Sequence, residues 1–212
     1  MNAQIDTAQS DRLRAQILAE LNLKEANKPV FFLFVANNFR LKGLAVLIKA
    51  MQQLQANEMG RRAYLIVVGN GRPHKYRRLA KKLNVHKKTI FLGAIRHIQN
   101  TLAISDVAVL PTFYDPSSRY TLEAIAAGKP VITTRYNGAT DLFVDNRHGK
   151  VIDSPEDVHA LTEAINYFTD TNNIQKASEA IIADNLKEKI SISRVAEQLM
   201  SVYTLILQKS RR

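Results

Sequence analysis

Short apolar runs, separated by segments with helical spacing, constrain the fold of this chain more than any other feature of its sequence. Val30–Ala36, Ala63–Val68 and Val107–Leu110 are apolar at nearly every position, which is typical of strands buried on both faces. Thr89–Leu92 and Pro130–Thr133 are two further predicted strands. Because buried strands that alternate with helices form βαβ units, the sequence predicts an α/β fold with a doubly wound parallel sheet.

Helical segments complete this prediction in the last third of the chain. Residues 158–168 form one helical segment, and the apolar residues between 195 and 206 are spaced for a C-terminal helix. We therefore divide the chain into a leading helix and linker at 1–28, a central α/β domain at 29–187 and a C-terminal helix at 188–212.

Length and composition exclude several other classes of protein. The 212 residues, 46% of them hydrophobic, can bury one good core but are too few for both domains of a two-lobed α/β enzyme. The chain contains no cysteine, which excludes a disulfide scaffold and a thiolate metal site. It contains no Asp-x-Asp motif, and its five histidines do not form a ligand cluster, so we expect no metal site. No apolar run approaches the roughly 18 residues of a membrane span.

The formal charge of +11 favours anionic partners. Residues 72–88 contain eight Lys and Arg and no acid. One interpretation of this run is a solvated helix face. The other is peripheral contact with an anionic membrane leaflet, to which each nearby basic residue contributes about 1 kcal/mol. Specific nucleic-acid binding is not expected, because no recognition motif or aromatic platform lies among the basic residues.

Candidate binding residues follow the first two predicted strands. Ligands of open α/β sheets bind outside the carboxyl ends of the strands. Arg40 and Lys42 follow the first strand directly before a predicted helix, where cations and free N–H groups suit phosphate oxygens. Gly69 and Gly71 follow the second strand. This pair of glycines is compatible with a ligand contact and equally with a tight turn.

Two acids follow the strand that ends near Leu110. Asp115 precedes a predicted helix and Glu123 lies within it. We expect the main-chain N–H groups of Ser118, Arg119 and Tyr120 to be unpaired at the helix start and able to bind a diphosphate. A carboxylate at Glu123 suits a ribose diol, and one at Asp115 suits hydroxyls beyond the phosphates. The alternatives are an N-cap or turn role for Asp115 and an exposed helix acid at Glu123.

Five motifs, taken together, resemble the C-terminal, donor-binding domain of retaining glycosyltransferases of family four, which have the GT-B fold. They are Lys42-Gly43, Gly69-Asn70-Gly71, Phe91-Leu92-Gly93, Asp115-x7-Glu123 and Ala127-Gly128-Lys129-Pro130-Val131. The resemblance covers roughly residues 30–170 and implies that the α/β domain is the Rossmann-like half of a GT-B fold. Within the family, residues 37–43 and 67–85 are similar to lipopolysaccharide core heptose glucosyltransferases.

The resemblance implies a role for each candidate residue. Lys42 would bind the donor diphosphate, Glu123 the ribose diol and Asp115 the transferred sugar. Backbone groups of Ala94 and Ile95 would contact the nucleobase edge. The other residues implied to contact the donor are Arg40, Gly69, Gly71, Ser118, Arg119, Tyr120 and Thr121. Asp115 is one methylene shorter than the usual Glu. Many relatives carry an Arg where this chain has Asn37 or Leu41, and the sequence leaves open whether Arg40 replaces it.

The implied activity is transfer of a hexose from a nucleotide sugar, expected to be a UDP-hexose, with retention at the anomeric carbon and without a metal or other cofactor. The expected setting is synthesis of lipopolysaccharide or another cell-surface glycan, in the cytoplasm, with peripheral contact at the inner face of the membrane. The acceptor-binding N-terminal domain is absent, so this chain alone is expected to bind nucleotide weakly and to transfer nothing. The alternative is a non-catalytic nucleotide-binding or regulatory module of the same fold.

Overall fold

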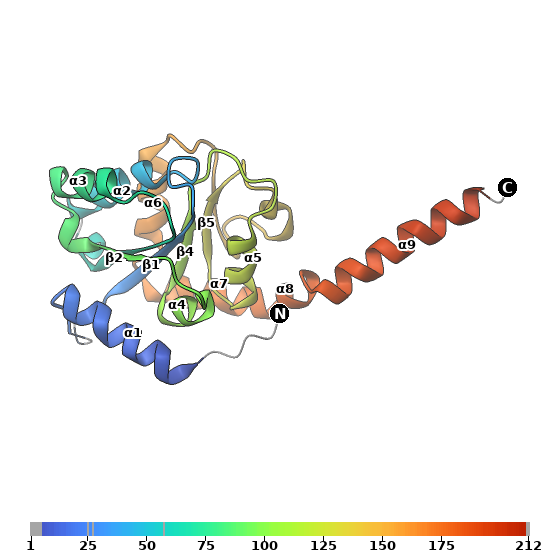
Figure 1. Ribbon diagram of the computed structural model, residues 1–212, viewed down its shortest axis with the longest axis horizontal. Coiled ribbons are helices and arrows are strands. Elements are labelled where there is room, and N and C mark those ends of the chain that lie inside the picture. The colour runs from blue at the N-terminus through green and yellow to red at the C-terminus, as the bar shows by residue number, and fades with distance from the viewer. Residues whose placement is uncertain (1–5, 25, 27, 57, 211–212) are drawn as a thin grey trace.

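A six-stranded parallel sheet forms the centre of the protein. The computed structural model describes residues 6–24, 26, 28–56 and 58–210 (Figure 1). The strand order is β3-β2-β1-β4-β5-β6, and every neighbouring pair is parallel. The strands are β1 (Val30–Val35), β2 (Ala63–Val68), β3 (Thr89–Gly93), β4 (Val107–Leu110), β5 (Val131–Thr134) and β6 (Gly149–Ile152). This order confirms the predicted doubly wound α/β fold.

Helices cover both faces of the sheet (Figure 1). The helix α2 packs against α3 and α6 on one side, whereas α1 packs against α4, and α5 against α8, on the other. Right-handed crossovers explain why α2 and α3 lie on one face and α4 and α5 on the other, because the direction in which successive strands are added reverses after β3. The helices are α1 (Thr7–Glu20), α2 (Leu44–Gln53), α3 (His74–Lys82), α4 (Ile98–Ile104), α5 (Arg119–Ala126), α6 (Val158–Tyr167), α7 (Thr171–Ala183), α8 (Leu186–Lys189) and α9 (Ile192–Ser210).

The strands at the centre of the sheet are buried on both faces, as their composition predicts. Phe31, Phe32, Leu33 and Phe34 of β1 are at most 1% exposed. Alternate residues of a strand point to opposite faces, so these four side chains contribute to both halves of the core. The apolar run from Val30 thus specifies a central strand between two layers of helices.

The last helix, α9, extends away from the rest of the molecule (Figure 1). Its apolar side chains are exposed along its length. They are Ile192, Val195, Leu199, Met200, Val202, Tyr203, Leu205, Ile206 and Leu207. No helix within the described part of the chain is long and apolar enough to cross a membrane.

Candidate functional site

The loops after β1 and β4 lie side by side at the carboxyl edge of the sheet. The chain continues from β1 toward β2 on one side and from β4 toward β5 on the other, so the order of strands reverses between β1 and β4. In doubly wound sheets this switch point is where ligands bind. Lys42 lies in the first of these loops and Asp115 in the second.

A glycine holds the two loops together. Gly43 has φ +76°, and a Cβ atom there would lie 2.0 Å from the carbonyl oxygen of Pro111. The backbone N–H of Phe113 also donates to the carbonyl oxygen of Leu41, at 2.9 Å. Because the backbone of Gly43 lies this close to the backbone of Pro111, any side chain at position 43 would push the two loops apart.

Lys42 and Asp115 form an ion pair across the switch point. Lys42 Nζ lies 2.8 Å from Asp115 Oδ2 and also donates to the carbonyl oxygen of Tyr114, at 2.8 Å. The side chains of Lys42 and Asp115 are only 18% and 14% exposed. Two residues that are 73 positions apart in the sequence therefore meet in one site. The pair is screened less by salt than a fully exposed pair would be.

A buried asparagine, Asn137, fixes the loop that carries Asp115. Its Oδ1 accepts hydrogen bonds from the N–H groups of Ser118, at 3.2 Å, and Ala139, at 3.1 Å. Its Nδ2 donates to Thr121 Oγ1, at 2.9 Å, and to Thr133 Oγ1, at 3.1 Å. The side chain is 0% exposed, and both its donor hydrogens and its oxygen are used. It joins the end of β5 to the start of α5.

These bonds correct one prediction. The N–H of Ser118 is not unpaired, because Asn137 Oδ1 accepts it. Ser118 Oγ in turn accepts from the N–H of Thr121, at 3.3 Å, so Ser118 is the N-cap of α5. The N-cap alternative for Asp115 is therefore wrong as well. Sequence reasoning missed Asn137, because an Asn-Gly pair after a strand indicates a turn without indicating that the Asn side chain is buried.

The second predicted acid also has a basic partner. Glu123 Oε1 accepts from Arg119 Nε at 3.1 Å, one turn earlier on α5. The Glu123 side chain is 19% exposed, whereas that of Arg119 is 74% exposed. Because Arg119 is mostly in solvent, a ligand with hydroxyl donors can compete with it for the carboxylate of Glu123.

Tyr120 belongs to the core. It is 8% exposed, and its hydroxyl donates to the carbonyl oxygen of Leu33. Burial raises the pKa of this hydroxyl well above its usual value. The side chain of Thr121 is also buried, so the side chains of both residues position α5 rather than face solvent.

Gly69 and Gly71 form a turn that closes against the first loop. Gly69 has φ +140°, and a Cβ atom there would lie 1.7 Å from the carbonyl oxygen of Ala36. A Cβ atom at Gly71 would lie 2.6 Å from the ring of Phe39. Both glycines are thus required by the packing of the turn, and a ligand contact remains a prediction.

The remaining predicted residues surround the same edge of the sheet. The N–H of Gly69 donates to the carbonyl oxygen of Gly93 at 2.8 Å, so the end of β3 lies beside the end of β2. Ala94 is exposed and Ile95 is half-buried directly after β3. Arg40 is exposed in the turn before α2. Within the described residues, no group of three or more His, Asp or Glu side chains could hold a metal ion.

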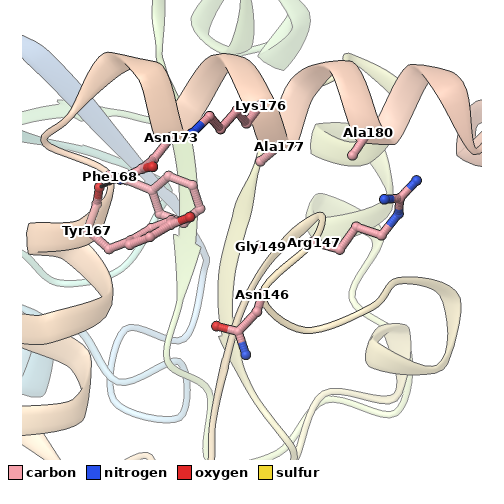
Figure 2. A pocket seen from close by; sticks show the side chains of 9 residues that line it. All are labelled: Asn146, Arg147, Gly149, Tyr167, Phe168, Asn173, Lys176, Ala177 and Ala180. Atoms are coloured by element: carbon pink, nitrogen blue, oxygen red, sulfur yellow. Dashed lines mark hydrogen bonds between the residues drawn. The ribbon is translucent and has the colours of Figure 1, made fainter.

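A cavity of about 290 Å³ lies elsewhere, at the amino end of β6 (Figure 2). Tyr167 and Phe168 form one part of its wall, and Asn146, Arg147 and Lys176 contribute polar groups. None of the predicted site residues lines it. The cavity is therefore separate from the switch point.

Beside this cavity, one acid joins two basic side chains. Asp184 binds Arg147 through two hydrogen bonds of 2.7 Å and His148 Nε2 through a third of 2.7 Å. These bonds hold the pKa of Asp184 far below its usual value. His148 Nδ1 accepts from the N–H of Val144, so Nε2 is the donor to Asp184. The cluster ties the end of α7 to the segment before β6.

Comparison with known proteins assigns the chain to a family. The profile of the family described as Glycosyl transferases group 1 matches residues 19–187, which is most of the chain. This chain is a member of the group 1 glycosyl transferases.

Individual relatives of this chain are glycosyltransferases by name. The lipopolysaccharide glucosyltransferase WaaG of Escherichia coli (strain K12) is 31% identical over 131 residues, which are 62% of this chain and 35% of that protein. The D-inositol 3-phosphate glycosyltransferase of Corynebacterium glutamicum (strain R) is 28% identical over 204 residues, which are 92% of this chain and 47% of that protein.

The fold agrees with that of a solved glycosyltransferase structure. The crystal structure of WaaG, a glycosyltransferase involved in lipopolysaccharide biosynthesis, superposes with a TM-score of 0.70 at 26% identity, covering 88% of this chain and 47% of that one. The chain therefore has the Rossmann-like half of the GT-B fold. It spans less than half the length of these relatives.

Proposed function

We propose that this chain is the donor-binding half of a retaining glycosyltransferase that uses no metal and transfers a hexose from a UDP-hexose. The observation that carries the proposal is the Lys42–Asp115 ion pair at the switch point of a group 1 glycosyl transferase. It combines a cation suited to phosphate oxygens with an acid suited to sugar hydroxyls.

Charge stabilisation is the main chemical task of these residues. When the bond from the hexose to the diphosphate breaks, negative charge grows on the departing phosphate oxygens. Lys42 Nζ, already oriented by the carbonyl oxygen of Tyr114, would donate to those oxygens. Fixed donors of this kind contribute several kcal/mol when charge develops in a site of low dielectric constant.

The acids would orient the donor. Asp115 would accept hydrogen bonds from hydroxyls of the transferred hexose, and Glu123 would accept from the ribose diol after releasing Arg119. Backbone groups of Ala94 and Ile95 would contact the nucleobase edge. Orientation matters because a reacting centre must be held close to its attack geometry before transfer is fast.

The relatives support a particular setting. The name of the Escherichia coli relative combines glucose transfer with lipopolysaccharide, and we propose that this chain acts in the synthesis of lipopolysaccharide or another cell-surface glycan, in the cytoplasm. Since the chain spans 35% of that relative, we further propose that transfer requires an acceptor-binding lobe supplied outside these residues.

Nucleotide titration tests the proposal. UDP, GDP and ADP, with and without an attached hexose, would be titrated into the chain by calorimetry or by NMR shifts. We expect UDP and UDP-hexose to bind, and Lys42→Ala and Glu123→Ala to weaken binding about tenfold or more. Matched controls are Lys49→Ala, an exposed lysine on α2, and Glu197→Ala, which breaks an Arg–Glu pair on α9.

The outcomes separate the interpretations. The assigned site is wrong if the control variants lose as much nucleotide affinity as the Lys42 and Glu123 variants, or if the Lys42 and Glu123 variants lose none. Binding of UDP with no gain from the hexose, and no transfer after an acceptor lobe is restored, would favour the non-catalytic nucleotide-binding module.

A further inference from the structure

The positive charge of this protein is concentrated in one continuous part of the sequence. Residues 59–105 contain 11 Lys and Arg and no Asp or Glu, whereas the rest of the chain contains 19 Lys and Arg and 19 Asp and Glu. The formal net charge of +11 therefore belongs entirely to residues 59–105. The remainder of the chain is formally neutral.

The fold places these residues together at one end of the molecule. Apart from α4, they form β2 and β3, which are the last two strands on one side of the sheet, together with α3 and the turns η3 (Met59–Arg62) and η4 (His86–Lys88). All the Lys and Arg of residues 59–105 except Arg96 lie in α3, η3 and η4 or directly before α3. In Figure 1 α3 lies at the end of the molecule farthest from α9. The protein thus has a basic end and a neutral body.

Most cations of the basic end are exposed, and none of them has an acidic partner among the described residues. Tyr76 and Ala80 are buried on the side of α3 that faces the core, so the basic residues of α3 lie on its outer side. No ion pair of residues 6–24, 26, 28–56 and 58–210 includes them. The exposed cations of the basic end are Arg61, Arg72, Lys75, Arg77, Arg78, Lys81, Lys82, Lys87 and Arg96, whereas Arg62 and Lys88 are half-buried.

The aromatic rings at this end are covered. Lys75 lies over Tyr76, Arg77 over Phe91 and Lys88 over Tyr64, with cation-to-centroid distances of 4.8, 4.7 and 4.0 Å. Proteins that bind single-stranded nucleic acid stack bases on exposed rings. Residues 59–105 contain no other Phe, Tyr or Trp, so this end offers charge without stacking.

We propose that the basic end docks on a bilayer that contains anionic lipids. A layer of anionic headgroups requires only many cations on one side of a protein, and each Lys or Arg near such a surface strengthens binding about fivefold. A molecule charged at one end also approaches an anionic surface in one orientation.

Docking through α3 leaves the candidate site accessible. The switch point lies between β1 and β4, and β2 and β3 separate it from the outer edge of the sheet. Since neighbouring strands are about 4.8 Å apart, the site lies on the order of 10 Å from that edge. Because the docking surface does not include the candidate site, vesicle binding should require no nucleotide. It can therefore be measured whether or not the proposed transfer reaction is correct.

Vesicle sedimentation tests the proposal. The 212-residue chain would be mixed with vesicles of phosphatidylcholine alone or of phosphatidylcholine and phosphatidylglycerol in equal amounts, at low and at physiological ionic strength. We expect binding only to the anionic vesicles, weakened by salt. The variant Arg78→Gln, Lys81→Gln, Lys82→Gln should bind on the order of 100-fold more weakly.

A charge-matched variant is the control. Lys176→Gln, Lys187→Gln and Lys189→Gln remove the same charge from exposed positions on α7 and α8, far from the basic end. Retained binding in this variant supports docking through α3. Equal loss in both variants, or no binding to anionic vesicles by the unaltered chain, overturns it. The proposal also fails if a single-stranded oligouridylate binds more tightly than the vesicles and loses affinity in the α3 variant.

Discussion

Cations occur in two different arrangements in this protein. At the switch point Lys42 and Arg119 each contact an acid, at 2.8 and 3.1 Å. At the basic end the exposed Lys and Arg of α3 have no acid beside them in the described residues. Paired charges cancel beyond a few ångströms and fix local geometry, whereas uncompensated charges produce a field that reaches a Debye length, about 8 Å at physiological salt. The first arrangement suits a binding site and the second an extended surface.

The largest expected effect comes from separating the switch-point pair. Gly43→Ala places a methyl group against the carbonyl oxygen of Pro111 and strains a left-handed backbone, so we expect a loss of about 3 kcal/mol in unfolding free energy. Nucleotide binding should be lost in parallel, because Lys42 and Asp115 move apart. Urea denaturation and calorimetry measure the two effects.

Gly128→Ala is the matched control. Gly128 has φ +71°, close to the value at Gly43, but a Cβ atom there meets nothing within 4 Å. We expect only the cost of the left-handed conformation, about 1 to 2 kcal/mol. Equal destabilisation in both variants would mean that the Pro111 contact does not hold the loops together.

A smaller effect is expected when the support of the pair is removed. Asn137→Ala removes the partner of the buried Ser118 N–H and of the Thr121 hydroxyl, and we expect a loss of about 2 to 3 kcal/mol in unfolding free energy. Asn173→Ala removes a single hydrogen bond, to the carbonyl oxygen of Tyr167, and should cost about 1 kcal/mol or less. If both variants unfold at the same urea concentration, Asn137 is not the support inferred for the acidic loop.

Removing the negative charge of Asp115 should leave Lys42 without an acidic partner, like the cations of the basic end. In Asp115→Asn the ammonium group no longer faces a carboxylate, so UDP should bind about fivefold more tightly at low salt, with a steeper salt dependence. UDP-glucose should gain less, because the proposed hydroxyl acceptor is weakened. Asp141→Asn, at an exposed acid in the turn Gly138–Leu142, removes the same charge and should change neither affinity. Weaker UDP binding in Asp115→Asn would contradict competition between Asp115 and phosphate for Lys42.

The third arrangement of charges is the cluster in which Asp184 binds both Arg147 and His148. Its removal should have the smallest effect on stability, and that effect should depend on pH. The folded protein lowers the pKa of Asp184 through its bonds to Arg147 and His148. Because the carboxyl group has a lower pKa in the folded than in the unfolded protein, it stabilises the folded state at any pH above the unfolded-state pKa of about 3.9. This stabilisation is lost as the pH falls toward the pKa of the folded state. Asp184→Asn should therefore be less stable than the unaltered chain at pH 7, with the difference shrinking below about pH 4. Asp153→Asn, which removes the same charge from the exposed pair with Arg135, is the matched control.

Much of the fold could be predicted because its strands are simple to recognise. The bounds of β2 and β4 coincide with the predicted runs, since both strands are buried along their whole length. β6 was missed, because Gly149–Ile152 is short, contains Lys150 and forms the edge of the sheet, where an apolar pattern is not required. The charge run at 72–88 was visible in the sequence, whereas the basic end as one surface depends on the packing of α3 beside β2 and β3.

The sequence by itself determined that Lys42, Asp115 and Glu123 would lie at the carboxyl edge of a parallel sheet, because residues that follow buried parallel strands meet at one edge. Only the tertiary structure decided that Lys42 pairs with Asp115 and that Asn137 takes the N–H of Ser118. Both contacts join segments that are apart in the sequence, and the first depends on the close approach of Gly43 to Pro111. The local sequence pattern determines which strand a residue follows. The packing of one loop against another determines which side chains come within hydrogen-bonding distance.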